Sequence, residues 1–291
     1  MRLVKSRRDL DQALAHLDGP DGVGLVATMG FFHAGHVSLM KQAVADGKSV
    51  VSIFVNPRQF GPEEDFDRYP RDSARDLQIA EEAGIDLVYM PPEADVYPPD
   101  FATLVTVSEL SDLYCGHYRP GHFQGVTTVV ARLLGLIKPR RAYFGQKDYQ
   151  QSAIIRRMVA DLVLDVEVRV LPTVREESGL ALSSRNVFLT EAQRQAAPAL
   201  HQALVDTERE MLAGERDGAR LLSALERRLK RIPGFKPQYW ALADRRNLEP
   251  KGTAAIGDVL LVAGHFGETR LIDNCLLGES NQGARTLLEL T

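Results

Sequence analysis

The sequence predicts an α/β protein with a Rossmann-like, doubly wound parallel sheet and a second, smaller α+β domain at the C-terminal side. Over the first 175 residues, short apolar runs rich in β-branched residues alternate with segments of helical apolar spacing. After about residue 175, charged helical segments come first and strand-like runs follow. We therefore expect a domain over residues 1–175 and a smaller domain over residues 176–291, linked by the polar segment 175–179.

The elements of the first domain follow from this alternation. Strands are expected at residues 23–28, 50–55, 85–90, 104–107, 142–144 and 166–171, and helices at residues 37–46, 72–83, 126–137 and 149–162. In the second domain, Thr190 and Gln193 form a capping-box pattern that opens a helix reaching residue 212. A charged helix over 215–232 is ended by Pro233 and Gly234, and strands follow at 238–242 and 259–263.

Composition excludes several classes of protein. The chain has 291 residues, 44% of them hydrophobic and 25% charged, with a net charge of −4, so a nucleic-acid footprint is not expected. Cys115 and Cys275 have no Cys or His at metal-ligand spacing, which disfavours a disulfide framework and a structural zinc site. The chain shows no secretory leader and no apolar run long enough to span a bilayer, so a cytoplasmic protein is expected.

The most informative segment is His33-Ala34-Gly35-His36, which lies where the first strand turns into a helix. Backbone N–H groups and the positive end of the helix dipole point outward at such a place, and anions bind there. Imidazoles at i and i+3 can face the same side of one turn and donate hydrogen bonds to phosphate oxygens. The pattern predicts a phosphate site and resembles the His-x-Gly-His motif of nucleotidyltransferases, which handle the triphosphate of ATP.

Polar residues follow three further elements. Asn56 and Gln59 come after the second strand, and Gln59 is a candidate for binding a small hydroxy acid. Asp76 lies one turn into the helix that Asp72 is expected to cap, and its carboxylate is a candidate ligand for magnesium. The loop with Arg119 and His122 also enters a helix, and a cation and an imidazole there suit an anionic ligand.

The second strong segment, Gly145-Gln146-Lys147-Asp148, ends a strand and starts a helix. Lys147 supplies a point charge for phosphate, and Asp148 can accept from ribose hydroxyls. Gln151, one turn on, can share their helix face. The alternative interpretation is a helix cap beside an incidental lysine.

A third segment, Ser183-Ser184-Arg185-Asn186, places two hydroxyls and a guanidinium within four residues, a composition that can wrap a phosphate. The loop 179–186 has a polar backbone entered through Gly179, and we expect few apolar anchors and a loop that closes over a bound nucleotide. The alternative interpretation is a linker that caps the following helix.

In this order, the motifs resemble those of the pantoate–β-alanine ligase family. The similarity extends from about residue 28 to residue 186 and returns at residues 267–274, Gly-Glu-Thr-Arg-Leu-Ile-Asp-Asn. The resemblance implies a homodimer in which the smaller C-terminal domain, residues 176–291, acts as a lid on the first domain. It also implies that Mg-ATP converts pantoate into pantoyl-adenylate and releases pyrophosphate. The amine of β-alanine then attacks the adenylate to give pantothenate and AMP.

The resemblance also implies roles for individual residues. His33 and His36 would hold phosphates, while Lys147 and Arg185 would stabilise the developing charge. Gln59 and Gln151 would bind pantoate. The complete implied ATP site comprises Met29, His33, His36, Gly145, Lys147, Asp148, Val174, Leu182, Ser183, Ser184 and Arg185, with Met29 also beside pantoate.

The chain departs from the family pattern around three of these motifs. Phe31, Phe32 and Ala34 flank the first histidine, Arg58 follows Asn-Pro, and Gln146 replaces the usual Glu. No phosphate-binding group is deleted, so we expect altered constants rather than lost activity. A nucleotidyltransferase for another small acid, and a non-catalytic nucleotide-binding protein, are the alternatives.

Overall fold

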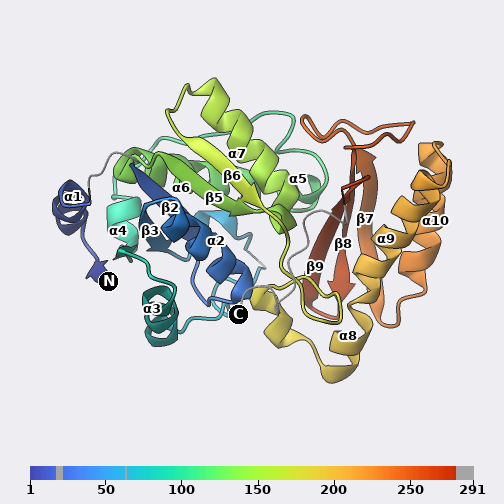
Figure 1. Ribbon diagram of the computed structural model, residues 1–291, viewed down its shortest axis with the longest axis horizontal. Helices are drawn as coiled ribbons and strands as arrows, with labels where there is room; N and C mark the ends of the chain where they lie inside the picture. The colour runs from blue at the N-terminus through green and yellow to red at the C-terminus, as the bar shows by residue number, and fades with distance from the viewer. Residues whose placement is uncertain (18–21, 63, 280–291) are drawn as a thin grey trace. The chain divides into compact units, whose positions relative to one another are not determined.

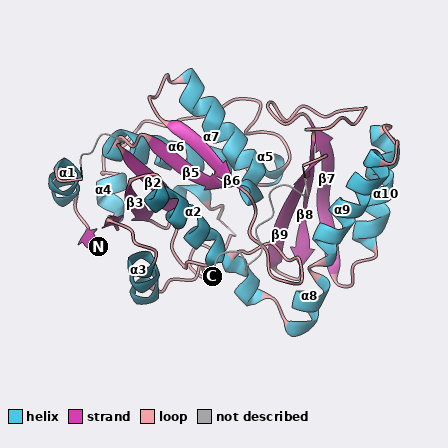
Figure 2. Ribbon diagram, in the orientation of Figure 1, coloured by secondary structure: helices cyan, strands magenta, loops and turns pink. Residues whose placement is uncertain are grey.

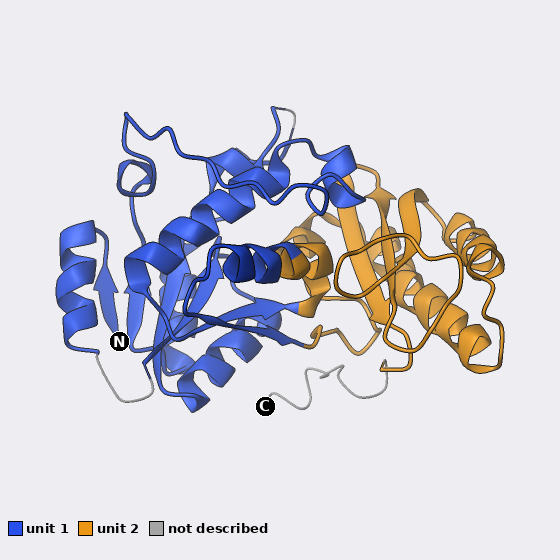
Figure 3. Ribbon diagram, turned by 90° about the horizontal axis from the view of Figure 1, so that it is seen from above, with its two compact units in different colours: residues 1–145, 154–171 blue, residues 146–153, 172–291 orange. Residues whose placement is uncertain are grey.

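The computed structural model describes residues 1–17, 22–62 and 64–279. It contains two compact units: unit 1 is Met1–Gly145 with Ile154–Leu171, and unit 2 is Gln146–Ala153 with Pro172–Thr291 (Figure 3). Residues 146–153 thus belong to the same unit as the C-terminal part of the chain. The expected domain boundary at residue 175 stays a prediction.

Unit 1 contains a six-stranded, entirely parallel sheet (Figures 1 and 2). Its order is β1-β4-β3-β2-β5-β6, which confirms the doubly wound α/β fold. Its strands are β1 Arg2–Val4, β2 Val23–Thr28, β3 Lys48–Ile53, β4 Leu87–Tyr89, β5 Arg141–Gly145 and β6 Glu167–Leu171.

Both faces of this sheet are buried, as expected of parallel strands. On one face, Val26 and Val51 pack with Met40 of helix α2 in one apolar cluster. Leu25 and Val50 point to the other face and are also almost fully buried. The helices of this part of the chain are α1 Arg7–Ala15, α2 Ala34–Ala45, α3 Ser73–Glu82, α4 Glu93–Val96, α5 Cys115–Tyr118, α6 His122–Ile137 and α7 Tyr149–Asp161.

The strand order reverses between β2 and β5, which are neighbours in the sheet although helices and two strands separate them in sequence. Ligands of open α/β sheets bind beyond the carboxyl ends of the strands at such a switch point. The chain leaves β2 toward His33 and leaves β5 at Gly145. The fold therefore brings two of the predicted phosphate-binding segments out of neighbouring strand ends.

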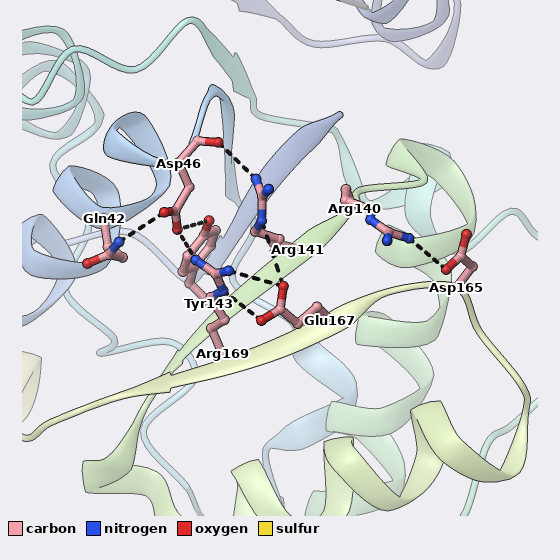
Figure 4. A network of polar contacts seen from close by, with 8 residues as sticks. All are labelled: Gln42, Asp46, Arg140, Arg141, Tyr143, Asp165, Glu167 and Arg169. Carbon is pink, nitrogen blue, oxygen red and sulfur yellow. Dashed lines mark hydrogen bonds and ion pairs between the residues drawn. The ribbon is translucent and has the colours of Figure 1, made fainter. Parts of the chain in front are cut away.

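A charged network lies at the amino-terminal ends of strands β5 and β6, opposite the ends from which the chain runs to the predicted site (Figure 4). Asp46, at the C-terminal end of α2, accepts from Arg169 Nη1 at 2.5 Å and from the Tyr143 hydroxyl at 2.7 Å. Arg169 also pairs with Glu167, and Arg141 donates to the Asp46 carbonyl at 2.8 Å. These charges pair with one another, so we interpret this network as structural.

Unit 2 contains an antiparallel sheet in the order β7-β8-β9 and a core shared with its helices. Leu260 and Val262 of β8 and Leu271 and Cys275 of β9 belong to the same apolar cluster as Leu204 of α9. Its remaining elements are α8 Glu191–Ala196, α9 Ala199–Leu212, α10 Gly218–Lys230, β7 Phe235–Ala243, β8 Val259–Phe266 and β9 Thr269–Leu276.

Several expected elements differ in the structure. The expected strand at 104–107 is wrong: Val105 N donates to Thr128 Oγ1 and its carbonyl accepts from Thr127 Oγ1, so side chains replace a strand partner. The expected helix from Thr190 to residue 212 is two helices, because Pro198 lies at their junction. The capping box of Thr190 and Gln193 is confirmed. Among the described residues, no helix is long and apolar enough to cross a membrane.

Candidate active site

The turn after β2 orients both histidine rings through the backbone. His33 is the N-cap of α2, and its Nδ1 accepts from Gly35 N at 3.1 Å. His36 Nδ1 accepts from His33 N at 3.3 Å, and the ring centroids lie 4.1 Å apart. In a neutral imidazole whose Nδ1 accepts, the proton is on Nε2. Each ring therefore presents Nε2–H as its donor, which is the polarity that a phosphate oxygen requires.

Asp76 of α3 holds the same turn from behind. Its Oδ2 accepts from Phe31 N and its Oδ1 from Phe32 N, both at 2.7 Å. The Asp76 side chain also packs closely against Gly30: a Cβ at that position would lie only 2.8 Å from Asp76 Oδ2. Gly30 has a φ of +80°, which also favours glycine. Burial raises the pKa of Asp76, although the two N–H groups act in the opposite direction. Asp76 thus fixes the backbone that leads to His33.

Each Asp76 oxygen accepts one backbone N–H and keeps a second lone pair, so the magnesium role expected for Asp76 stays a prediction. Among the residues that the structure describes, no three His, Cys, Asp or Glu side chains gather into a group able to hold a metal ion. Asp72 caps α3 as expected, with its carboxylate accepting from Arg75 N at 3.1 Å. The protein thus shows no built cage for magnesium in these ranges.

Met29, which follows β2, and Gln59, which lies in the short helix η1 (Pro57–Gln59) after β3, are in contact. Gln59 Nε2 lies 3.2 Å from the Met29 sulfur, and its Oε1 accepts from Asn56 Nδ2 at 3.0 Å. Asn56 is 1% exposed and is itself held by Gly125 O and by the Tyr97 hydroxyl, which donates to Asn56 Oδ1 at 2.8 Å. Asn56 therefore fixes the orientation of the Gln59 carboxamide, a supporting role that the sequence did not predict.

The loop before α6 supports Gln59 rather than offering an anion site of its own. Arg119 pairs with Glu64 at 2.5 Å, and its Nη2 donates to Gln59 O at 3.3 Å. His122 Nδ1 lies 2.7 Å from the same carbonyl. The expectation that Arg119 and His122 receive an anion is therefore wrong for the guanidinium, which is engaged with Glu64.

The departures Arg58 and Phe32 are absorbed by packing. The Arg58 guanidinium lies over the Tyr97 ring, 4.4 Å from its centroid, and over Phe101 at 4.9 Å. Phe32 is 1% exposed and belongs to the core cluster beside α2. Phe31 has a φ of +51° and lies below the Arg75 guanidinium.

In unit 2, the turn η2 (Gln146–Asp148) carries the predicted lysine. Lys147 Nζ lies 3.7 Å from Asp148 Oδ1, and the Lys147 side chain is 20% exposed. The carbonyls of Gln146 and Lys147 accept from Asn274 Nδ2 at 2.9 and 3.0 Å. Gln151 lies in the first turn of α7, whereas Lys147 and Asp148 belong to η2, and the expectation that the three share one helix face stays a prediction. Asn274 lies in the segment 267–274 that resembles the family, but the sequence predicted no role for it.

The segment before α8 brings Val174 and Leu182 together, because Leu182 N donates to Val174 O at 3.0 Å. Ser183 caps the short helix η3 (Ser184–Phe188), with Oγ accepting from Arg185 N at 3.3 Å. The expectation of few apolar anchors is wrong at Leu180, which is 4% exposed and joins the core of unit 2. Whether the loop moves on nucleotide binding stays a prediction.

Arg175 is the main residue that sequence reasoning misplaced. It was expected in a polar link, but it is 6% exposed and forms a two-fold ion pair with Asp273 at 2.7 and 2.8 Å. Burial alone would raise the pKa of Asp273, but the charge and hydrogen bonds of Arg175 outweigh it and hold that pKa below its ordinary value. A basic residue in a polar run gives no sequence signal for such a buried partner.

Together, the parallel sheet, its switch point and the His-x-Gly-His turn define an α/β nucleotide-binding enzyme. A family model described as Pantoate-beta-alanine ligase matches residues 2–276. The pantothenate synthetase of Thermotoga neapolitana is 49% identical over 88% of this chain and 92% of the relative. That of Thermus thermophilus is 49% identical over 94% of this chain and 98% of the relative.

Solved structures agree with these sequence matches. The crystal structure of pantothenate synthetase from Thermus thermophilus matches with a TM-score of 0.90 and 48% identity, covering 95% of this chain and 99% of that one. A pantoate-beta-alanine ligase from Francisella tularensis, complexed with Beta-gamma ATP and beta-alanine, matches with a TM-score of 0.77 and 32% identity over 95% and 97% of the two chains. The chain belongs to the pantoate–β-alanine ligase family.

Proposed function

We infer that this chain catalyses the ATP-dependent condensation of pantoate with β-alanine, giving pantothenate, AMP and pyrophosphate. The observation that carries this inference is the family match over residues 2–276, which includes every predicted phosphate-binding segment. Pantoate's carboxylate attacks the α-phosphate of ATP and displaces pyrophosphate. The β-alanine amine then attacks the acyl carbon of pantoyl-adenylate and displaces AMP.

We assign the phosphate contacts to His33 and His36 through their Nε2–H groups. The supporting observation is that backbone N–H groups occupy both Nδ1 atoms. A neutral imidazole can make this contact, so neither ring needs to act as a base.

Lys147 and Arg185 would stabilise the charge that moves onto the pyrophosphate, with Ser183 and Ser184 donating to its oxygens. Asp148 and Gly145 would hold the ribose. Apart from the two chain neighbours, no atom of the described residues lies within 4 Å of a Cβ built on Gly145, which leaves room for a ligand there. Val174 and Leu182, joined by a backbone hydrogen bond, would flank the nucleotide.

For pantoate, we propose contacts from Gln59 and Gln151, with Met29 beside the reacting carboxylate. The Asn56–Gln59–Met29 chain of contacts supports this assignment, because it fixes a carboxamide that can both donate and accept. Converting the carboxylate into an acyl-adenylate replaces a poor leaving group by AMP. The chain's main task is therefore positioning and charge stabilisation.

Magnesium belongs to this proposal as an ion that arrives on the ATP phosphates, because the described residues do not provide a cage and Mg²⁺ is commonly held by phosphates and water. We also propose a homodimer in the cytoplasm, as the family resemblance implies. No nucleic acid or membrane partner is proposed. Light scattering of the purified protein checks the dimer.

The direct test supplies the purified protein with ATP, pantoate and β-alanine and measures pantothenate and AMP. We expect equal amounts of the two products and no pantothenate when any substrate is omitted. A nucleotidyltransferase for another small acid is the second candidate, since the same fold and His-x-Gly-His turn would serve it. AMP formation that depends on another acid and not on pantoate would favour that candidate.

A further inference from the structure

Asn274 of β9 connects the C-terminal strand to the predicted phosphate-binding lysine. The side chain is buried, at 3% exposure, and its Nδ2 donates to the carbonyls of Gln146 and Lys147. Its Oδ1 accepts from Gln146 Nε2 at 3.3 Å. Both hydrogens of the amide are therefore used on two consecutive backbone groups of one turn, across 127 and 128 residues of sequence.

The two carbonyls lie on either side of the Lys147 Cα. The Gln146 carbonyl belongs to the peptide plane that enters Lys147, and the Lys147 carbonyl belongs to the plane that leaves it. Because each peptide unit is planar, fixing both planes fixes φ and ψ of Lys147. Those two angles set the direction of its Cα–Cβ bond and hence where the ammonium group can reach.

The strand that carries Asn274 is anchored on its other face. Successive side chains of a strand point to opposite faces, so Asp273 points away from Asn274 and toward the helix-covered core. There Arg175 binds both Asp273 oxygens, and Asp273 Oδ1 also accepts from Asn274 N at 2.8 Å. Arg175 Nη1 in turn donates to Gly179 O at 3.2 Å, at the entry to the Ser183–Arg185 segment. One strand thus supports both phosphate-binding segments of unit 2.

We propose that Asn274 is a positioning residue that aims Lys147 at the phosphates of ATP, with the Arg175–Asp273 pair holding its strand. The inference rests on the proposed function and adds a residue to it. Asn274 touches no reacting atom in this assignment. It acts through the backbone of Lys147.

The test is a double-mutant cycle on pantoate-dependent exchange of labelled pyrophosphate into ATP. Lys147→Ala should slow exchange by about 10²–10³-fold, as loss of a charge-stabilising donor does. Asn274→Ala should slow it by roughly 10–100-fold, as a misplaced catalytic group does, with the KM for pantoate changed less than about twofold. Since Asn274 acts through Lys147, the double variant should be no slower than Lys147→Ala alone.

One control variant and one isosteric variant separate positioning from a general loss of stability. Leu225→Ala opens a cavity in the same core, where Leu225 is 0% exposed, without touching the turn. It should lower the unfolding midpoint yet leave the exchange rate of the folded protein unchanged. Asn274→Asp keeps the side-chain volume and the contact from Gln146 Nε2 but removes both donors, so it should be at least as slow as Asn274→Ala.

Amide hydrogen exchange without substrates gives a readout that does not require activity. Residues 146–153 should lose protection in Asn274→Ala and Asn274→Asp but not in Leu225→Ala. Normal exchange activity in the folded Asn274 variants, multiplied losses in the double variant, or unchanged protection at 146–153 would each overturn the inference. If the wild type itself lacks pantoate-dependent exchange, the proposed function fails, while the protection measurement still decides the role of Asn274.

Discussion

Two of the three predicted phosphate-binding segments, the turn before His33 and the turn that carries Lys147, are each held by one polar side chain from a distant segment, but the two supports have opposite polarity. In unit 1, the Asp76 carboxylate accepts from two consecutive N–H groups, of Phe31 and Phe32. In unit 2, the Asn274 amide donates to two consecutive carbonyls, of Gln146 and Lys147. Each of these two side chains therefore forms hydrogen bonds with a pair of neighbouring backbone groups.

The difference follows from what each backbone leaves unpaired. A chain that approaches a helix exposes N–H groups, which a carboxylate accepts. The carbonyls on either side of Lys147 need a donor instead, and a neutral amide supplies two. An amide also adds no negative charge near a lysine meant for phosphate. In unit 2 the buried charge is placed one residue away, at Asp273, and is paired with Arg175.

The buried ion pair behind Asn274 should produce the largest effect. Asp273→Ala leaves Arg175 buried without its partner and should lower the free energy of unfolding by about 3–5 kcal/mol. The exposed pair Arg209–Asp206 is the matched control, and Asp206→Ala should cost less than about 1 kcal/mol. Urea unfolding of both variants checks this. A loss at Asp273 no larger than at Asp206 would mean that unit 2 does not depend on this anchor.

Breaking the support in unit 1 should have a smaller effect. Asp76→Ala leaves two N–H groups of the turn without their acceptor and should cost about 1–3 kcal/mol, while Asp76→Asn keeps one acceptor and should cost less. Pyrophosphate exchange should slow in both variants, because the turn carries His33. Asp72→Ala is the control: it removes the cap of α3 at about 1 kcal/mol but leaves the turn intact. Equal exchange rates in the Asp76 and Asp72 variants would contradict this role.

The histidines sharpen the comparison at the level of side chains. His33 both caps α2 and is proposed to donate through Nε2. Asparagine is a good N-cap and keeps a donor, so His33→Asn and His36→Asn should be milder than the corresponding alanine variants. The difference should be about 0.5–2 kcal/mol in stability at His33, and single-turnover adenylation should follow the same order at both positions. If asparagine is no better than alanine in adenylation, donation is the wrong role and proton transfer must be reconsidered.

The smallest expected effect is a pH dependence in unit 2. Burial, and then the charge of Arg175, lower the pKa of His201 below its ordinary value of 6.5. The unfolded chain therefore binds this proton more readily than the folded chain, and stability falls as pH drops below about 6.5. Wild type should lose stability relative to His201→Gln between pH 7.5 and 5.5. A constant difference over that range would show that folding does not lower the pKa of His201.

Much of the fold could be predicted from local pattern. The alternation of apolar runs and helical spacing is enough to predict the parallel sheet, because buried strands and amphipathic helices differ in period. The three-residue strand β1 was missed, since only Val4 of its residues is buried, whereas the equally short β4 is buried throughout and lies within the apolar run 85–90. Strand β9 was missed as a strand, although the sequence matched it to the family, because polar Asp273 and Asn274 interrupt its apolar alternation. The prediction of a strand at 104–107 was wrong because the side-chain hydroxyls of Thr127 and Thr128 form hydrogen bonds with the backbone groups of Val105.

The candidate site was likewise predictable only where its residues form local sequence motifs. The histidines, Lys147, Asp148 and the Ser183–Arg185 segment are contiguous motifs, so sequence alone pointed to them. The supporting roles of Asp76, Asn56 and Asn274 could not be predicted, because their partners lie far away in sequence and are defined by backbone atoms. A backbone partner leaves no mark in the residue type at its position.

The most direct test of the function is whether pantoate alone supports exchange of labelled pyrophosphate into ATP. The two-step chemistry predicts exchange with pantoate and Mg-ATP in the absence of β-alanine, because the adenylate forms before the amine reacts. Exchange should vanish without pantoate. Exchange that strictly requires β-alanine, or that proceeds equally well with other small acids, would contradict the account.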